Sequence, residues 1–89
     1  MVRKHLLFKG RVQGVGFRYT LYQRAHLMAL TGWVRNCSDG SVEACLQGDY
    51  VKIQSVVDYM YSIPYIRIED CEIENLEVLS NEKSFEVKY

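Results

Sequence analysis

The sequence has no long hydrophobic run and no excess of charge of either sign. No stretch of the 89 residues approaches the about 20 apolar residues that a membrane-spanning helix needs. The cluster Leu6-Leu7-Phe8 is too short for the hydrophobic region of a signal peptide. With 11 basic and 11 acidic residues, the chain does not favour binding to a nucleic acid backbone or an anionic membrane. We therefore expect a cytoplasmic protein without nucleic acid or membrane partners, in which any anion site is local.

Cysteine and histidine are also scarce. The three cysteines form no Cys-x-x-Cys pair, and neither of the two histidines lies at metal-ligand spacing from a cysteine. An odd number of cysteines is typical of reduced thiols in the cytoplasm. The sequence thus predicts no metal site and no cofactor. Its length predicts one domain over residues 1–89 with a modest core, and we expect it to act as a monomer.

Glycine is sparse but concentrated in one place. Three of the six glycines fall within Gly10–Gly16, and a helical pattern begins at Phe17. Glycine lets a backbone curl so that several N–H groups point at one spot, and the positive end of a helix dipole adds to that spot. Arg18 in the first helical turn is unfavourable there unless an anion offsets its charge. These features predict a small anion site suited to a phosphoryl group, inorganic phosphate or sulfate.

The remaining pattern alternates strands and helices. Asp49 is a candidate N-cap for a second helix, which ends before the single proline, Pro64. The other predicted elements are a helix at Phe17–Leu30 and strands at His5–Lys9, Trp33–Cys37, Ser41–Gln47, Asp70–Leu76 and Phe85–Tyr89. The order β-α-β-β-α-β with a short C-terminal strand predicts an α+β, ferredoxin-like fold, with one antiparallel sheet and two helices on one face.

The hairpin between the second and third predicted strands determines where a second polar side chain, that of Asn36, points. A loop at residues 38–40, with Gly40 left-handed, pairs Arg35 with Glu43 and leaves Trp33 on the less covered face. The apolar residues that it keeps together on the other face are Val34, Val42, Ala44 and Leu46. In that register Asn36 points to the helix-covered face at the end of its strand. The first two strands of a split β-α-β unit run parallel with one strand between them, so their ends lie roughly 9–10 Å apart. Asn36 should therefore lie near the glycine-rich loop.

Two motifs at a fixed separation give the chain a resemblance to a known family. They are Gly10-Arg11-Val12-Gln13-Gly14-Val15-Gly16-Phe17-Arg18, and Gly32-Trp33-Val34-Arg35-Asn36 followed by Asp39-Gly40-Ser41-Val42-Glu43. With these motifs and the closing strand, the chain closely resembles the acylphosphatases, strongly from Leu6 to Gly48 and weakly to Tyr89.

The resemblance implies hydrolysis of carboxyl–phosphate mixed anhydrides without a metal or a covalent intermediate. It implies that Arg18 binds the phosphoryl group and that Asn36 positions the attacking water. The backbone amides that it implies as phosphate ligands are those of Gln13, Gly14, Val15, Gly16 and Phe17.

Two other functions fit parts of the pattern. The same site suits a non-catalytic phosphate- or acylphosphate-binding module of the kind appended to larger carbamoyl-transfer proteins, although the lack of a linker at either end favours the enzyme. Trp33 and the seven tyrosines suit stacking on RNA bases. However, no Lys/Arg-Gly-Phe motif occurs on a central strand and the net charge is zero, so the sequence disfavours RNA binding.

Overall fold

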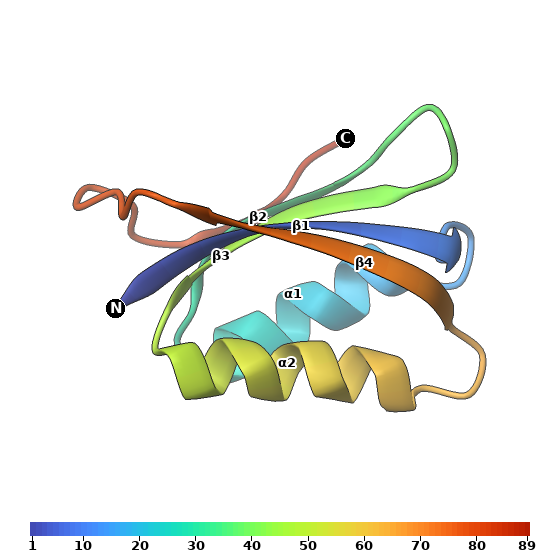
Figure 1. Ribbon diagram of the computed structural model, residues 1–89, viewed down its shortest axis with the longest axis horizontal. Helices are drawn as coiled ribbons and strands as arrows, with labels where there is room; N and C mark the ends of the chain where they lie inside the picture. Colours follow the sequence, from blue (N-terminus) through green and yellow to red (C-terminus); the bar gives the residue numbers. More distant parts are fainter.

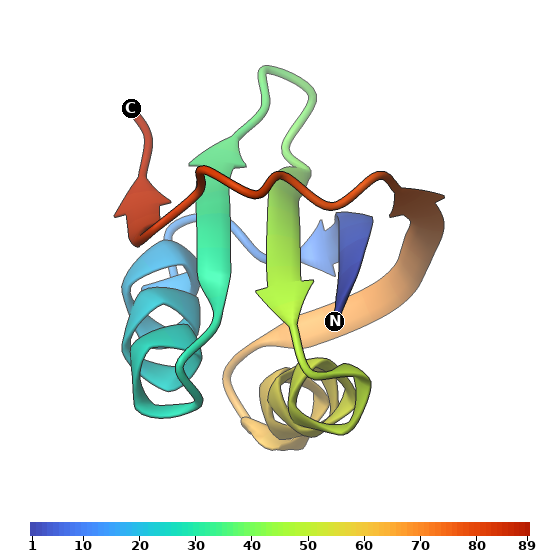
Figure 2. The same ribbon diagram turned by 90° about the vertical axis from the view of Figure 1, so that its left-hand side faces the viewer.

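The computed structural model describes residues 1–89 and arranges them as a five-stranded sheet with two helices (Figure 1). In chain order the elements are β1 (Val2–Arg11), α1 (Phe17–Leu27), β2 (Thr31–Asn36), β3 (Val42–Gly48), α2 (Tyr50–Ser62), β4 (Arg67–Leu76) and β5 (Phe85–Val87). The strand order is β4-β1-β3-β2-β5. Both helices lie against one face of the sheet (Figures 1 and 2), which confirms the predicted ferredoxin-like fold.

The helices cover the sheet because each carries a stripe of apolar residues at helical spacing. The buried side chains of α1 are Phe17, Leu21 and Ala25, and those of α2 are Ile53, Val56, Val57 and Met60. They belong to one hydrophobic cluster of 18 buried residues. Within it, the ring of Phe17 lies 4.9 Å from that of Phe8 on β1, centroid to centroid. This aromatic contact fixes the first residue of α1 against the sheet.

The register of the β2–β3 hairpin is the predicted one. Arg35 pairs with Glu43 and Asn36 with Val42, and Gly40 has a φ of 94° in the loop. Because β3 is antiparallel to both β1 and β2 and lies between them, β1 and β2 run parallel. Their C-terminal ends therefore meet at the same edge of the sheet, where the glycine-rich loop and Asn36 both lie.

The sheet is mixed, and the expectation of an antiparallel sheet was wrong at one edge. β5 pairs in parallel with β2, with Gly32 opposite Phe85 and Val34 opposite Val87. Figure 2 shows β5 beside β2 at the edge above α1. The alternation of apolar residues predicted a strand there, but such a pattern carries no information on the partner or its direction.

Some elements differ in length from the prediction. α1 ends at Leu27 and not at Leu30, because the chain turns through Ala29 at a positive φ of 55°. β1 and β4 both begin three residues earlier than predicted, since they pair with each other over nearly their whole length. The other strand ends lie within one or two residues of their expected positions. Neither helix combines the length and the apolar character required of a membrane span.

Candidate active site

The loop between β1 and α1 curls because two of its glycines are left-handed. Gly14 has a φ of 75° and Gly16 a φ of 74°. A Cβ added at either position would meet no atom within 4 Å, so these glycines are needed for their conformation and not for lack of space. The left-handed region disfavours other residues by ~1–2 kcal/mol. Buried Val12 and Phe17 anchor the two ends of the loop in the core.

The start of α1 has backbone N–H groups that donate a hydrogen bond to no acceptor in the protein. Gly16 occupies the N-cap position, and no side chain caps the helix. The backbone N–H groups of residues 13–19 donate to no acceptor within the chain. The first N–H group that makes a hydrogen bond is that of Thr20, which donates to the Gly16 carbonyl at 3.0 Å. Uncommitted N–H groups on a curled loop at a helix N-terminus form an anion-binding arrangement.

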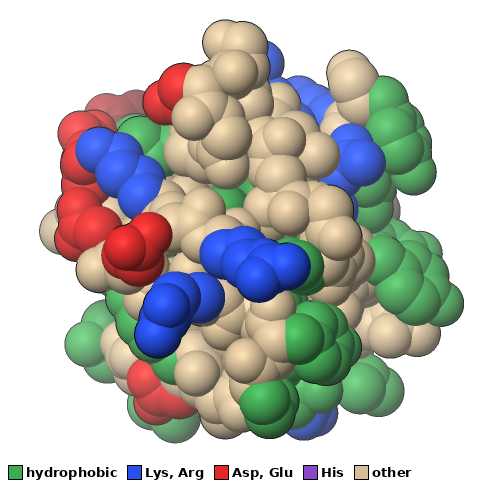
Figure 3. All heavy atoms as spheres, turned by 90° about the vertical axis from the view of Figure 1, so that its right-hand side faces the viewer, with side chains coloured by type: hydrophobic (Ala, Val, Ile, Leu, Met, Phe, Trp, Pro, Cys, Tyr) green, Lys and Arg blue, Asp and Glu red, His purple; other side chains and the backbone are tan.

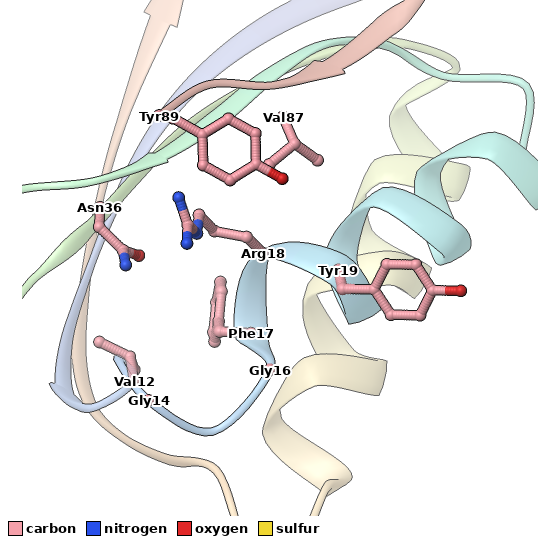
Figure 4. A pocket seen from close by; sticks show the side chains of 9 residues that line it. All are labelled: Val12, Gly14, Gly16, Phe17, Arg18, Tyr19, Asn36, Val87 and Tyr89. Carbon is pink, nitrogen blue, oxygen red and sulfur yellow. The ribbon is translucent and has the colours of Figure 1, made fainter.

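Arg18 is half-buried, and its guanidinium is held by the C-terminal end of the chain. Nη1 donates to the carbonyl oxygen of Lys88 at 3.2 Å, and Cζ lies 4.8 Å from the centre of the Tyr89 ring (Figure 4). These contacts offset part of the unfavourable position of a cation in the first helical turn. The guanidinium makes no other hydrogen bond to the protein, which leaves most of its five N–H donors for a ligand.

Asn36, the last residue of β2, faces the same cavity as Arg18. Figure 4 shows its carboxamide turned toward the guanidinium, whereas the ring of Tyr19 points away. The Asn36 side chain makes no hydrogen bond to the protein, so its acceptor and its donors are both available. The cavity has a volume of about 200 Å³ and is lined by Val12, Gly14, Gly16, Phe17, Arg18, Tyr19, Asn36, Val87 and Tyr89.

Most of the residues that the sequence assigned to the site line this cavity. Gly14, Gly16, Phe17, Arg18 and Asn36 are among its lining residues. The other two assigned residues, Gln13 and Val15, do not line it. The side chain of Gln13 turns to the β2–β3 hairpin, and Val15 packs against the hydrophobic cluster.

Sequence reasoning missed the contribution of β5. Val87 and Tyr89 line the cavity, and the Lys88 carbonyl accepts from Arg18. The signal was present in the alternation of Phe85, Val87 and Tyr89, which predicted only a strand. A parallel pairing with β2 would have placed the end of that strand beside Asn36.

Arg35 does not belong to the cavity. Its Nε donates to Oε1 of Glu43 at 2.6 Å on the sheet face without helices, as the predicted register required. Nε2 of His5 lies 2.6 Å from the other carboxylate oxygen. The His5 hydrogen bond, and after it the bond from Arg35, hold the pKa of Glu43 below its ordinary value of 4.5. Arg18 is consequently the one basic side chain that lines the cavity.

Charge is unevenly distributed at the end of the molecule that carries the loop. Figure 3 shows basic side chains across the middle of this end and acidic side chains gathered to one side. No group of three or more His, Cys, Asp or Glu side chains lies close enough together to hold a metal ion. The residues that line the cavity offer backbone N–H groups, the Arg18 guanidinium and the Asn36 carboxamide as donors.

Comparison with known proteins gives a consistent result. The model of the family described as Acylphosphatase matches residues 4–87. An acylphosphatase of Geobacillus kaustophilus is 40% identical over 100% of this chain and 96% of its own length. One of Bordetella parapertussis is 37% identical over 94% of this chain and 82% of its own length.

Solved structures extend the likeness. The crystal structure of acylphosphatase from Bacillus subtilis superposes with a TM-score of 0.92, at 33% identity and over 100% of both chains. HypF of T. kodakarensis superposes with a TM-score of 0.85 at 30% identity, over 100% of this chain and 12% of that much longer one. Matched in sequence over nearly all of its length and in structure over the whole of it, the chain belongs to the acylphosphatase family and is an enzyme that hydrolyses acyl phosphates.

Proposed function

We propose that Arg18 and the loop amides hold the phosphoryl group of the acyl phosphate, while Asn36 directs a water molecule at the phosphorus. One observation carries this proposal. Residues whose backbone N–H groups have no acceptor in the protein line a single cavity together with the Arg18 guanidinium and the Asn36 carboxamide. Positioning and electrostatic stabilisation make up most of the catalysis of phosphoryl transfer, and this set of groups supplies both.

Phosphoryl binding follows from the charge and the directions of the donors. Arg18 can bind two phosphoryl oxygens in a bidentate manner. The N–H groups of the loop from Gln13 to Phe17, at the positive end of α1, suit the remaining negative charge. During transfer this charge is spread over three equatorial oxygens, so the same donors stabilise the transition state.

Asn36 suits the positioning of water because it approaches from a different strand. The ends of β1 and β2 are separated by β3 and therefore lie two inter-strand spacings apart, roughly 9–10 Å in total. This distance leaves room for a phosphoryl group and a water between the loop and the carboxamide. A carboxamide offers an acceptor and two donors and does not titrate. It can therefore orient a water over a wide range of pH.

The bond changes need no further side chain. The water oxygen forms a bond to phosphorus while the bond between phosphorus and the acyl oxygen breaks, and the water proton passes to an oxygen of the phosphate. The leaving group is a carboxylate, whose conjugate acid has a pKa of about 4, so it departs without a general acid. A site of this composition accordingly functions without a histidine or a paired carboxylate among its lining residues.

We also infer that the enzyme acts as a monomer in the cytoplasm on a small acyl phosphate. β4 is an edge strand, and its exposed carboxylates disfavour pairing with the edge of a second copy. The three cysteines are all unpaired, as in proteins of a reducing compartment.

Turnover of benzoyl phosphate in the presence of a chelator tests the proposal. We expect hydrolysis by the purified protein and competitive inhibition by inorganic phosphate. Phosphate binding without turnover would support the non-catalytic module. Phosphate inhibition that is unchanged in Arg18→Ala would overturn the role of the cavity.

A further inference from the structure

The side chain of Gln13 connects the glycine-rich loop to the β2–β3 hairpin. Its Nε2 donates to the carbonyl oxygen of Cys37 at 2.7 Å and to that of Ser41 at 2.9 Å. Both acceptors can only accept, so the orientation of the carboxamide is fixed by its partners, with the NH₂ group toward the hairpin. Both donors of this NH₂ group are therefore used.

The two acceptors form the neck of the hairpin. The N–H of Cys37 donates to the Ser41 carbonyl at 2.9 Å, and the N–H of Gly40 donates to the Cys37 carbonyl at 3.3 Å. Each carbonyl thus has one lone pair engaged within the hairpin and one engaged by Gln13. The neck directly follows Asn36, so Gln13 holds the residue next to the proposed water-positioning side chain.

This contact lies where backbone pairing between the two strands has ended. The ladder between β1 and β3 stops at Phe8 and Val42, and β1 continues to Arg11 paired with β4 alone. No other hydrogen bond joins the loop at residues 12–16 to the hairpin at residues 37–41. The half-buried Gln13 carboxamide takes the place of the missing ladder bonds.

We propose that the Gln13 side chain is a positioning residue that sets the phosphate-binding loop at the correct distance and angle from Asn36. This inference rests on the proposed function, and it concerns the side chain only, because the backbone N–H of Gln13 belongs to the phosphate-binding loop. In-line attack requires that phosphorus and water be aligned, and a shift of about 1 Å in such a geometry lowers the rate ~100-fold. The loop binds one reactant and Asn36 the other, so the contact between them controls the alignment.

A double-mutant cycle between Gln13 and Asn36 tests this proposal. Gln13→Met keeps the length of the side chain and removes both donors. We expect kcat for benzoyl phosphate to fall ~10- to 100-fold, with the inhibition constant for inorganic phosphate changed by no more than about threefold. In the Asn36→Ala background the same substitution should lower kcat by no more than about threefold, because no positioned water is left to misalign.

A matched control is available on α2. The Gln54 carboxamide is exposed and donates to Asp58 at 2.9 Å, so Gln54→Met makes the same chemical change far from the cavity. It should leave kcat unchanged. Urea denaturation of each variant measures its folded fraction, which should be the same in all assays. If Gln13→Met does not fold, Gln13→Asn takes its place, since its carboxamide is one methylene too short to reach both carbonyls.

The outcomes separate the two proposals. An equal loss of kcat in both backgrounds, or no loss in either, overturns the positioning role of Gln13 and leaves that of Asn36 intact. A loss of phosphate binding as large as the loss of kcat also overturns it, because the side chain would then shape the loop alone. Near-normal turnover by Asn36→Ala overturns the proposed function itself.

Discussion

The N-termini of the two helices satisfy their backbone donors in opposite ways. At α2 the carboxylate of Asp49 accepts from the N–H groups of Val51 and Lys52, at 2.8 and 3.3 Å. At α1 the N-cap is Gly16, no side chain caps the helix, and the first turn carries the cation Arg18. The first arrangement stabilises a helix by itself, whereas the second gains most from a bound anion.

We infer that this difference separates a structural helix end, at α2, from a ligand-binding one, at α1. Every helix N-terminus begins with backbone N–H groups that lack partners inside the helix, and with the positive end of the helix dipole. A built-in carboxylate at α1 would occupy the donors that a phosphoryl group needs and would repel its charge. We infer that α1 forgoes the stability of a cap, typically about 1 kcal/mol, in favour of ligand binding.

The most damaging change should be Arg18→Ala. It removes the one basic side chain of the cavity. In the proposed function, this is the charge that stabilises the transferring phosphoryl group. We expect turnover of benzoyl phosphate to fall ~10³-fold or more, with weaker inhibition by inorganic phosphate. Arg24→Ala is the matched control, since that guanidinium lies 3.6 Å from the centre of the Tyr59 ring on the other helix. Similar losses in the two variants would show that the position of Arg18 is not special.

Asn36→Ala should lower turnover ~10²–10³-fold, by an amount like that of losing one oriented transition-state donor. Phosphate inhibition should weaken less than in Arg18→Ala, because the donors at α1 remain. Steady-state kinetics with phosphate as the inhibitor measures both effects. If Asn36→Ala retained most of its activity, the water-positioning role would have to be abandoned.

Gly16→Val should weaken phosphate binding through the backbone alone. The position has a φ of 74° and open space around it, so strain and not a clash is the cause. A penalty of ~1–2 kcal/mol, partly relieved by a shift of the loop, corresponds to roughly tenfold weaker binding. Titration calorimetry with inorganic phosphate measures it, and Gly16→Ala should show a smaller effect. Unchanged affinity in both variants would mean that the loop conformation does not matter.

The smallest effect should follow from Asp49→Ala, the corresponding change at the capped helix. Loss of the cap should lower the free energy of unfolding by about 1 kcal/mol in urea denaturation. Turnover and phosphate inhibition should stay at their original values, because Asp49 lies outside the cavity. A loss of activity without a loss of stability would contradict the division of roles between the two helix ends.

Much of this division could be predicted from local patterns. Asp49 was recognised as a cap from its residue type, and the glycines before Phe17 indicated an anion site. The register of the hairpin followed from the requirement that apolar residues share a face, and it placed Asn36 correctly. Each of these inferences uses residues that are close together in the chain.

The contacts that were missed join distant segments. β5 has three residues and pairs with a strand about fifty positions earlier, so no local pattern indicates its partner or its direction. The carbonyl of Lys88 beside Arg18 depends on that pairing. The bonds from Gln13 to the hairpin neck depend on how far two loops approach each other, which side-chain packing decides.

The order of strands and helices, the place of the proposed anion site and the identity of its proposed cation were all decided by the amino-acid sequence, because periodicity, glycine content and capping act over a few residues. The approach of Asn36 and the C-terminal strand to that site, and of the Gln13 carboxamide to the hairpin, was decided by tertiary structure. These groups come from separate segments, and only the burial of the apolar faces of the sheet and helices in one core brings them together.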